Sequence, residues 1–285
     1  MRVRLYLYLA RASVAALLLF FNVGAARAQD AARSKTGATT AAAPAAKPAE
    51  DEKALAILAR AVEVMGGRAY SEVKSITSSG YFTQFRDGVG SLPVKFQDYT
   101  VFPNSERTEF SGSGVKSIQV NVGSGGWVAD LKMKKLTDAT AQEAEDFRLT
   151  LRTSLDSALR GWWRTEGAGL SYVGRREAGL ARRNEVVRLK YPDGFEVEFE
   201  FDAKDGTPSK AKYRKQNAEG DQVEEEDRYE QFQTIGSVRT PFIIDHYRAG
   251  RQSSRVNYDS VEFNRPVPDS LFAKPDDIKK VKLSQ

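Results

Sequence analysis

The stretch from Phe195 to Phe201, FEVEFEF, alternates apolar and acidic side chains. Successive side chains of a β-strand point to opposite faces, so this spacing predicts a strand with one apolar and one charged face. The apolar face carries Phe195, Val197, Phe199 and Phe201. Alternation shows only that this face avoids water. It leaves open whether the face packs in an ordinary core or lines a cavity for an apolar ligand.

The same two-residue period recurs along most of the chain and predicts a large sheet. Strands are expected over 73–86, 92–102, 105–111, 115–122, 126–131, 170–176, 184–191, 194–202, 207–216, 222–234, 238–249 and 252–263. Turn residues such as YPDG at 191–194 and AKDG at 203–206 separate neighbours, which favours an antiparallel meander. A sheet of about 11 strands curls, because strand twist accumulates, and so presents a concave face.

Helical spacing occurs at two places. An opening helix is predicted from about residue 50, with Gly66 and Gly67 ending it. Its apolar stripe is Leu55, Leu58, Val62 and Met65. A longer helix is predicted after Asp138 as N-cap, with Gly161 near its end. Its apolar stripe is Ala144, Phe147, Leu151, Leu155, Leu159 and Trp162.

These elements predict an α+β fold: a curled antiparallel sheet, or half-open β-barrel, with helices covering its concave face. The opposite side of the longer helix carries Arg152, Asp156 and Arg160, which predicts a solvated face with modest ion-pair support. On the sheet, acids and bases of neighbouring strands are expected to pair in water. They are Glu196, Glu198 and Glu200 with Arg188, Lys190, Lys210, Lys212 and Arg214. The acidic run 224–227 is likewise expected to be solvated.

The first 28 residues predict a secretory signal peptide. Arg2, Arg4 and Arg11 precede an apolar run that ends in ARA at 26–28. The run is short for a spanning helix, which favours cleavage after Ala28 and a periplasmic protein, with a retained anchor as the alternative. Residues 29–49, rich in Ala, Thr and Pro, predict a disordered linker. Residues 50–285 are then a single domain.

Composition narrows the possible functions. The predicted signal peptide holds four of the 43 Lys and Arg residues and no acid, so the rest of the chain has 39 cations against 38 acids. This balance argues against nucleic acid as a partner. The chain has no cysteine, which excludes disulfides and thiol chemistry. Stability must therefore come from a packed core.

Residue types suited to catalysis or metal binding are scarce. His246 is the sole histidine, so neither a metal site nor a cofactor is expected. We expect His246 to be structural or at the surface, since no catalytic partner can be assigned to it. G-x-S-x-G, P-loop and G-x-G-x-x-G motifs are missing from the sequence. The prediction is a protein that is not an enzyme, with a hydrolase as the least supported alternative.

Three stretches, in this order, carry a likeness to a known family. They are AVEVMGGRAYSEVKSITSSG at 61–80, GSGGWVADLKMKKLTDA at 123–139 and VEFNRPVPDSLFAKP at 261–275. The first is a helix that ends in Gly-Gly before a long strand, and the second a Gly-Gly-Trp strand before the central helix. The third is a C-terminal stretch with two spaced prolines, Asp-Ser and a phenylalanine. Together they resemble the LolA-like superfamily of periplasmic lipoprotein carriers and their relatives. The resemblance implies a half-open barrel, helices as a lid over an apolar cavity for acyl chains, and a terminal phenylalanine that packs back on the barrel.

We therefore predict a non-catalytic periplasmic carrier or binding protein for a hydrophobic, lipid-like ligand. Its partners would be a lipid or acylated-protein cargo and membrane-bound donor or acceptor proteins, and it would act as a monomer. The predicted ligand-binding residues are Phe195, Val197, Phe199, Phe201, Trp127, Phe147, Leu151, Leu155 and Trp162. For Trp162 and Trp163, core packing is the alternative to an apolar lip at the cavity mouth. The alternative function is an envelope-stress sensing or scaffold module that binds a partner protein through the same fold.

Overall fold

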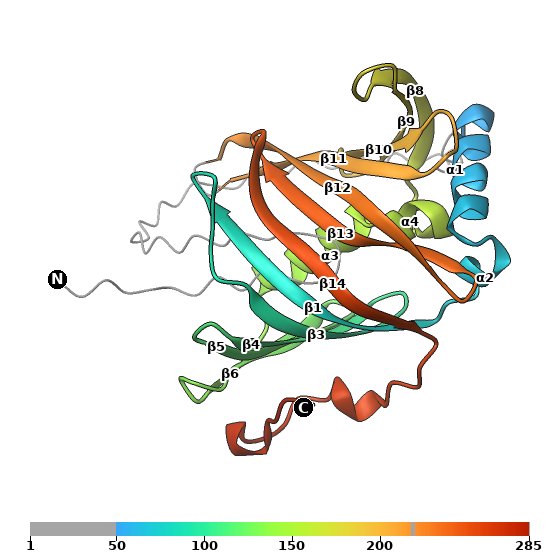
Figure 1. The fold of residues 1–285 in the computed structure, drawn as a ribbon. Helices are drawn as coiled ribbons and strands as arrows, with labels where there is room; N and C mark the ends of the chain where they lie inside the picture. The colour runs from blue at the N-terminus through green and yellow to red at the C-terminus, as the bar shows by residue number, and fades with distance from the viewer. Residues whose placement is uncertain (1–49, 218–219, 285) are drawn as a thin grey trace, which may run out of the picture.

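Fourteen strands form one antiparallel sheet in the computed structural model, which describes residues 50–217 and 220–284 (Figure 1). The first seven are β1 Ser75–Arg86, β2 Val89–Gly90, β3 Val94–Val101, β4 Ser105–Gly112, β5 Val115–Val122, β6 Gly125–Asp130 and β7 Lys135–Asp138. The others are β8 Gly169–Glu177, β9 Arg183–Lys190, β10 Glu196–Asp202, β11 Pro208–Gln216, β12 Gln222–Ile235, β13 Val238–Arg248 and β14 Arg251–Phe263.

The two halves of the chain meet in the middle of the sheet. The strand order is β7-β6-β5-β4-β3-β1-β14-β13-β12-β11-β10-β9-β8, with β2 paired to β1 off this path. The pairing of β1 with β14, which sets Ile76 opposite Phe263, joins the halves. The outermost strands, β7 and β8, do not pair with each other, so the described sheet is open.

The predicted strand number, about 11 or 12, is too low, since the sheet has 14 strands. All twelve segments with a two-residue period are strands, and the structure adds β2 and β7, which have only two and four residues. Segments this short contain too few alternations to be recognised from the sequence. The antiparallel arrangement itself follows the prediction, because short turns join neighbouring strands.

The opening helix has the predicted position. α1 spans Glu52–Met65, its N-cap Asp51 accepts a hydrogen bond from the Ala54 N–H at 3.0 Å, and α2 follows over Arg68–Ser71. Gly66 ends α1 with φ at 122°, and a Cβ atom there would lie 2.2 Å from the Ser237 carbonyl oxygen. Only glycine therefore fits between α1 and the turn after β12.

The predicted central helix is two helices, α3 at Ala141–Thr153 and α4 at Leu155–Arg160, followed by a 3-10 turn over Trp162–Arg164. Asp138 is not the N-cap, since it ends β7. Thr140 caps α3 instead, in a reciprocal capping box with Glu143. Ser154 separates the helices, because its backbone is extended and its Oγ accepts from the Ser157 N–H at 3.0 Å to start α4.

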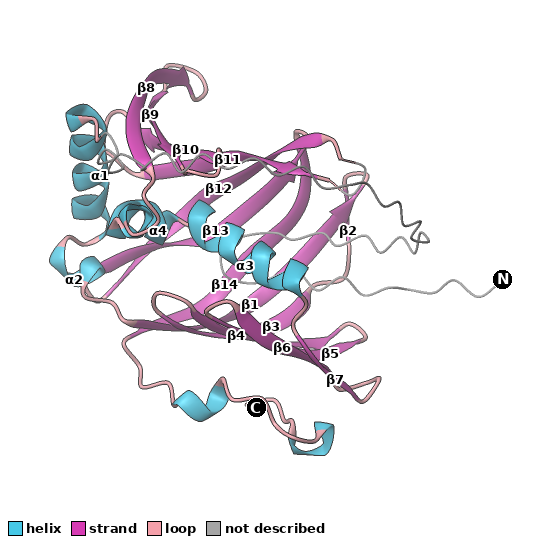
Figure 2. Cartoon of the chain, turned by 180° about the vertical axis from the view of Figure 1, so that it is seen from behind, coloured by secondary structure: helices cyan, strands magenta, loops and turns pink. Residues whose placement is uncertain are grey.

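The helices lie on one side of the sheet. Figure 2 shows α3 running across the strands, with α4 and α1 near β8 and β9. The main apolar cluster joins α1 and α4 to this concave side of the sheet. Its fully buried members include Met65, Phe96, Phe110, Trp163, Leu189, Val197, Phe199 and Phe201. This cluster positions both helices over the strands.

A second, smaller apolar cluster lies on the opposite face. Ile118, Val120, Trp127 and Ala129 pack there beneath the C-terminal segment, which contributes Val281 and the half-buried Phe272. This segment contains 3-10 turns at Asp269–Leu271 and Ile278–Lys280 and runs along β4–β6 in Figure 1. A phenylalanine that packs back on the sheet is what the family resemblance implied.

The predicted signal peptide and linker, residues 1–49, lie outside the described residues. Within the part of the chain that the structure describes, no helix combines the length and apolar character needed to cross a bilayer.

Candidate functional site

A cavity of about 100 Å³ lies between α4 and the concave face of the sheet. Its wall is mostly apolar and includes Met65, Ile76, Phe102, Leu155, Ile244 and Phe263. It is smaller than the cavity of about 150 Å³ that holds benzene, and far below the roughly 300–1,000 Å³ of drug-sized pockets. In this closed arrangement it can hold only a short apolar group, so a longer ligand requires α4 to move.

Arg160 fastens α4 over this cavity. Its Nε donates to Asp156 Oδ1 at 2.8 Å, and its Nη1 donates to the Ser71 and Val73 carbonyls at 3.2 and 3.1 Å. The guanidinium also lies 4.5 Å from the ring centroids of Tyr70 and Phe102. The prediction of a solvated face was wrong for Arg160, whose side chain is 8% exposed, because the segment between α2 and β1 covers it.

Tyr70 completes this group. Its hydroxyl donates to Asp156 Oδ1 at 2.8 Å. Burial, together with the Asp156 carboxylate, raises the pKa of Tyr70 well above its usual value, so the phenol stays a donor. We call Arg160, Asp156 and Tyr70 the Arg160 latch. It joins α4 to α2 through paired charges and satisfied hydrogen bonds.

Asp227 and His246 form a buried pair elsewhere on the concave face. They are cross-strand neighbours on β12 and β13, and Asp227 Oδ1 lies 2.5 Å from His246 Nδ1. Both side chains are at most 2% exposed. The acidic run was expected to be solvated, which is wrong for Asp227, because β12 turns this residue toward α3 and the core. His246 is buried rather than at the surface.

Glu225 precedes Asp227 by two residues and lies on the same face. Its carboxylate is 3.4 Å from Arg248 Nε. Burial raises the pKa of Glu225 to about 7, against the opposing attraction of Arg248. Glu224 points to the other face and pairs with Lys212 at 2.9 Å. Within the described residues, no group of three or more acidic or histidine side chains is arranged to hold a metal ion.

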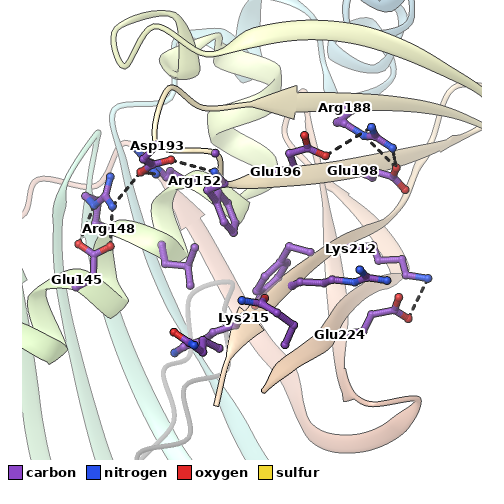
Figure 3. Close-up of a pocket in the computed structure, with 17 residues that line it drawn as sticks. Glu145, Arg148, Arg152, Arg188, Asp193, Glu196, Glu198, Lys212, Lys215 and Glu224 are labelled. Carbon is purple, nitrogen blue, oxygen red and sulfur yellow. Dashed lines mark hydrogen bonds and ion pairs between the residues drawn. The ribbon is translucent and has the colours of Figure 1, made fainter. Parts of the chain in front are cut away.

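A groove of about 840 Å³ lies beside α3, between its exposed side and β9–β11 (Figure 3). Arg152 Nη1 donates to Asp193 Oδ2 at 2.6 Å, and Arg152 Nε donates to Glu166 Oε2 at 2.7 Å. Its guanidinium lies 4.1 Å from the Tyr191 ring centroid, and its side chain is 5% exposed. The solvated face predicted for α3 is therefore also wrong at Arg152, which tethers α3 to the β9–β10 turn.

The cross-strand charge pairs are confirmed in part. Arg188 pairs with Glu198 at 2.7 Å and Lys190 with Glu196 at 2.9 Å. Lys210 and Lys212 instead pair with acids of β12. Glu200 is 1% exposed, contrary to the prediction.

Glu200 is buried because two neighbouring side chains replace water around its carboxylate. Arg176 Nη1 donates to Glu200 Oε1 at 2.5 Å and Asn184 Nδ2 donates to Oε2 at 2.9 Å. The outer face of β8–β10 is therefore a connected layer of ion pairs, most of them partly exposed.

The predicted ligand-binding residues occupy five environments. Leu155 lines the cavity under α4, and Phe195 lines the groove between the Tyr191 and Tyr213 rings. Val197, Phe199, Phe201 and Phe147 are buried, the first three of them in the main apolar cluster. Leu151 is half-buried, as is Trp162, which packs edge-on against Phe102 with ring centroids 5.2 Å apart. Trp163 is buried in the core.

Trp127 lies apart from the other predicted ligand-binding residues. It lies on the opposite face of the sheet, where its Nε1 donates to the Phe272 carbonyl at 2.9 Å. The Gly-Gly-Trp strand alternates as expected, but Trp127 faces the C-terminal segment instead of the helices. The sequence did not place the Arg160 latch or the Asp227–His246 pair either. The two-residue turn Gly236-Ser237 was a usable signal for the pair, because it sets Ile235 opposite Val238 and so fixes the register of β12 and β13.

Comparison with solved structures identifies the architecture. No protein-family model matches the chain, and no curated protein matches its sequence. The LolA superfamily protein NE2245 from Nitrosomonas europaea matches with a TM-score of 0.54 and 17% identity, over 78% of this chain and 97% of that protein. A DUF1329 family protein from Desulfovibrio piger matches with a TM-score of 0.55 and 11% identity, over 77% and 97%. The chain therefore has a LolA-like fold, as the three sequence stretches indicated.

Proposed function

We propose that this protein, with its LolA-like fold, is a non-catalytic periplasmic carrier or binding protein for a hydrophobic, lipid-like ligand. The basis is the apolar cavity that α4 closes over the concave face, with the Arg160 latch at its wall. An empty apolar cavity loses dispersion contacts, whereas an alkyl chain buried there gains about 0.8 kcal/mol per CH₂. A single-chain ligand or one arm of a lipid suits a site of this shape.

Uptake in this proposal requires α4 to lift from the sheet. The closed cavity is too small for a chain of many carbons, and α4 has only six residues. The extended backbone at Ser154, between α3 and α4, is the hinge that this movement would use. The tether of α3 through Arg152 and the latch of α4 through Arg160 have different partners, so this opening leaves the tether of α3 in place.

Native mass spectrometry tests the function directly. The protein is expressed with its own N-terminal segment, purified from a bacterial periplasm without detergent, and then extracted with organic solvent. A stoichiometric bound lipid is the expected result and names the cargo class. A clean ligand-free mass, together with no uptake of fatty acids or phospholipids offered in solution, would contradict the proposal.

A cavity-filling variant tests whether the ligand binds in the cavity under α4. Leu155→Phe adds ring volume to the cavity wall while keeping it apolar, and we expect lipid affinity to fall at least about tenfold. Phe201→Leu is the matched control, because Phe201 is buried in the same cluster without lining the cavity. The control should lose stability and keep its affinity. A folded Leu155→Phe protein with wild-type affinity would place the ligand elsewhere.

The second candidate is binding of a partner protein at the charged groove. Its volume of about 840 Å³, its paired charges and the exposed Arg214 at its wall suit a polar protein surface. Here Arg214→Glu should abolish co-purification of a defined partner and leave lipid uptake unchanged. Lipid-free protein whose partner depends on Arg214 would favour this function over the first.

A further inference from the structure

Four buried polar atoms on adjacent strands of the concave face make no hydrogen bond within the described part of the chain. They are Asp227 Oδ2, His246 Nε2, Tyr229 Oη and Ser254 Oγ. Asp227, His246 and Ser254 are successive cross-strand neighbours on β12, β13 and β14, and Tyr229 follows Asp227 on the same face of β12. Each of the four residues is at most 5% exposed. Buried polar groups are nearly always paired, so four orphans in one place indicate a missing partner.

We propose that Asp227, His246 and Tyr229 form a subsite for the polar group of the ligand, and that this group is a protonated amine. The inference rests on the proposed function, because the alkyl part of the same ligand would occupy the cavity under α4. It adds the chemistry of the head group, which an apolar cavity alone does not define.

The unpaired atoms of this subsite require hydrogen-bond donors from the ligand. An ionised carboxylate only accepts hydrogen bonds, so the contact of 2.5 Å between His246 Nδ1 and Asp227 Oδ1 makes Nδ1 the donor. A second proton on Nε2 would be a buried donor without an acceptor, which is costly, so Nε2 is an acceptor. Asp227 Oδ2 is also an acceptor, and the Tyr229 hydroxyl can accept. An ammonium group offers three donors on one atom, whereas a carboxylate offers none.

The charge of the surroundings favours a cation. The nearby cations are already engaged, Arg248 by Glu225 at 3.4 Å, Lys215 by Asp146 at 2.8 Å and Arg160 by Asp156 at 2.8 Å. Among the described residues, Asp227 pairs with the His246 ring and with no Lys or Arg side chain. The pKa of Tyr229 is raised by burial and then by the negative charges of Asp227 and Asp156, which marks a negative potential at its hydroxyl.

The subsite adjoins the apolar cavity. Tyr229 and Ile244 line that cavity, and they are direct cross-strand neighbours, two register positions from the Asp227–His246 pair and therefore the next pair on the same face. An alkyl chain under α4 thus has its polar end one residue pair away from the two free acceptors. A primary amine with a short or medium alkyl chain fits both parts.

Asp227, His246 and Ser254 are also the residue types of a hydrolytic triad. His246 Nε2 and Ser254 Oγ, however, make no hydrogen bond to each other, since both lack any partner in the described chain. The binding subsite accounts for three of the four unpaired atoms, including the Tyr229 hydroxyl and Asp227 Oδ2, which a triad would leave unexplained.

Calorimetric titration with chain-matched probes tests the subsite. The probes are octylamine, octanol, octanoate and octyltrimethylammonium at neutral pH, added to the purified protein. We expect octylamine to bind at least about tenfold more tightly than octanol, and octanoate to bind most weakly. Octyltrimethylammonium carries the charge without an N–H donor, so it should bind more weakly than octylamine.

The outcomes separate the two proposals. Equal affinities for octylamine and octanol would overturn the subsite and leave the lipid-binding function standing, and so would a preference for octanoate. Equal affinities for the two cations would overturn the hydrogen-bonded geometry. No binding of any probe or lipid would overturn the proposed function itself.

Variants assign the effect to residues. Asp227→Asn keeps the shape of the side chain and should lower octylamine affinity about tenfold to a hundredfold, with octanol affinity nearly unchanged. Tyr229→Phe removes one hydroxyl and serves where Asp227→Asn does not fold, with an expected loss of about fivefold. Ser117→Ala is the matched control, because Ser117 Oγ is also buried and unpaired but lies on β5. Octylamine affinity that is unchanged in Tyr229→Phe, or lowered equally in Ser117→Ala, would contradict the subsite.

Discussion

The guanidinium of Arg160 lies between Asp156, one helical turn earlier, and the carbonyls of Ser71 and Val73, which end α2 and precede β1. The Arg160 side chain thus forms an ion pair within α4 and also bonds α4 to the end of α2 and to the segment before β1. Opening the cavity breaks two main-chain hydrogen bonds and the stacking on Tyr70 and Phe102 together. The Arg160 latch should therefore set the rate at which the cavity opens.

We expect Arg160→Lys to open the cavity faster. Lysine keeps the charge but cannot reach Asp156 and two carbonyls at once, so the free energy of unfolding should fall by about 1–2 kcal/mol. Hydrogen exchange of α4 and of residues 71–73 should accelerate, and so should ligand dissociation measured by stopped flow. Arg68→Lys is the control, because the Arg68–Glu72 pair is 89% and 58% exposed and worth well under about 1 kcal/mol. Unchanged exchange in α4 would show that Arg160 does not hold it.

Arg152 and Arg148 share partners but differ in burial, which gives a second prediction. Both contact Glu166 and Asp193, yet the Arg152 side chain is 5% exposed and that of Arg148 is 42% exposed. Arg152→Ala should lower the free energy of unfolding by about 2 kcal/mol, because it removes the buried stacking on Tyr191 and two charge-assisted hydrogen bonds. Arg148→Ala should cost less than about 1 kcal/mol. Chemical denaturation of the two variants measures both, and similar losses would contradict the dominant role of Arg152.

Most of the sheet could be predicted from local sequence, because its strands are long and alternate cleanly. The turn Gly236-Ser237 illustrates how far this reaches. Counting eight residues outward from Ile235 and Val238 arrives at Asp227 and His246, which the structure pairs. Their contact was therefore available from the sequence, although their burial was not. Alternation assigns side chains to two faces without saying which face is covered.

The covering elements explain the remaining errors. The helical period of apolar residues continues through Ser154. The break between α3 and α4 depends on the extended backbone of Ser154 and on its capping hydrogen bond, and neither can be detected from periodicity. The sequence pattern predicts that Arg152 and Arg160 are solvated. Arg160 is buried because α2 packs against α4, and Arg152 because the β9–β10 turn packs against α3. The structure also shows where the apolar face of Phe195 to Phe201 packs. Val197, Phe199 and Phe201 are core, while the cavity lies further along the sheet.

The C-terminal segment depends on one buried arginine. Arg107 Nη1 donates to the Leu271 carbonyl at 2.8 Å and Nη2 donates to the Lys282 carbonyl at 3.1 Å, while its Nε pairs with Glu109 at 2.7 Å. Arg107→Met removes all three bonds and leaves Glu109 buried with only Ser284 as a partner, so we expect a loss of about 3 kcal/mol. Amides 281–284 should exchange faster, and limited proteolysis should cut the segment.

An exposed ion pair of the same segment provides the control for Arg107. Lys274→Ala breaks a contact with Asp138, whose side chain is 78% exposed, and should change stability by no more than about 0.5 kcal/mol. Equal effects of Arg107→Met and Lys274→Ala would show that the segment is held by its apolar contacts alone.

Glu225 makes stability depend on pH between about 4.5 and 7. Its pKa rises from 4.5 to about 7 in the folded protein, chiefly because it is buried. Below pH 4.5, Glu225 is protonated in both the folded and the unfolded state, so it does not make stability depend on pH. As the pH rises, the unfolded chain releases this proton first, so folding becomes less favourable until the folded pKa is passed, at a total cost of about 3 kcal/mol. Glu225→Gln should remove this slope and stabilise the protein at pH 8 by up to that amount. Urea denaturation from pH 4.5 to 8 measures it, with Glu224→Gln, on the opposite face, expected to keep the wild-type slope. A Glu225→Gln protein with the wild-type slope would assign the pH dependence to another group.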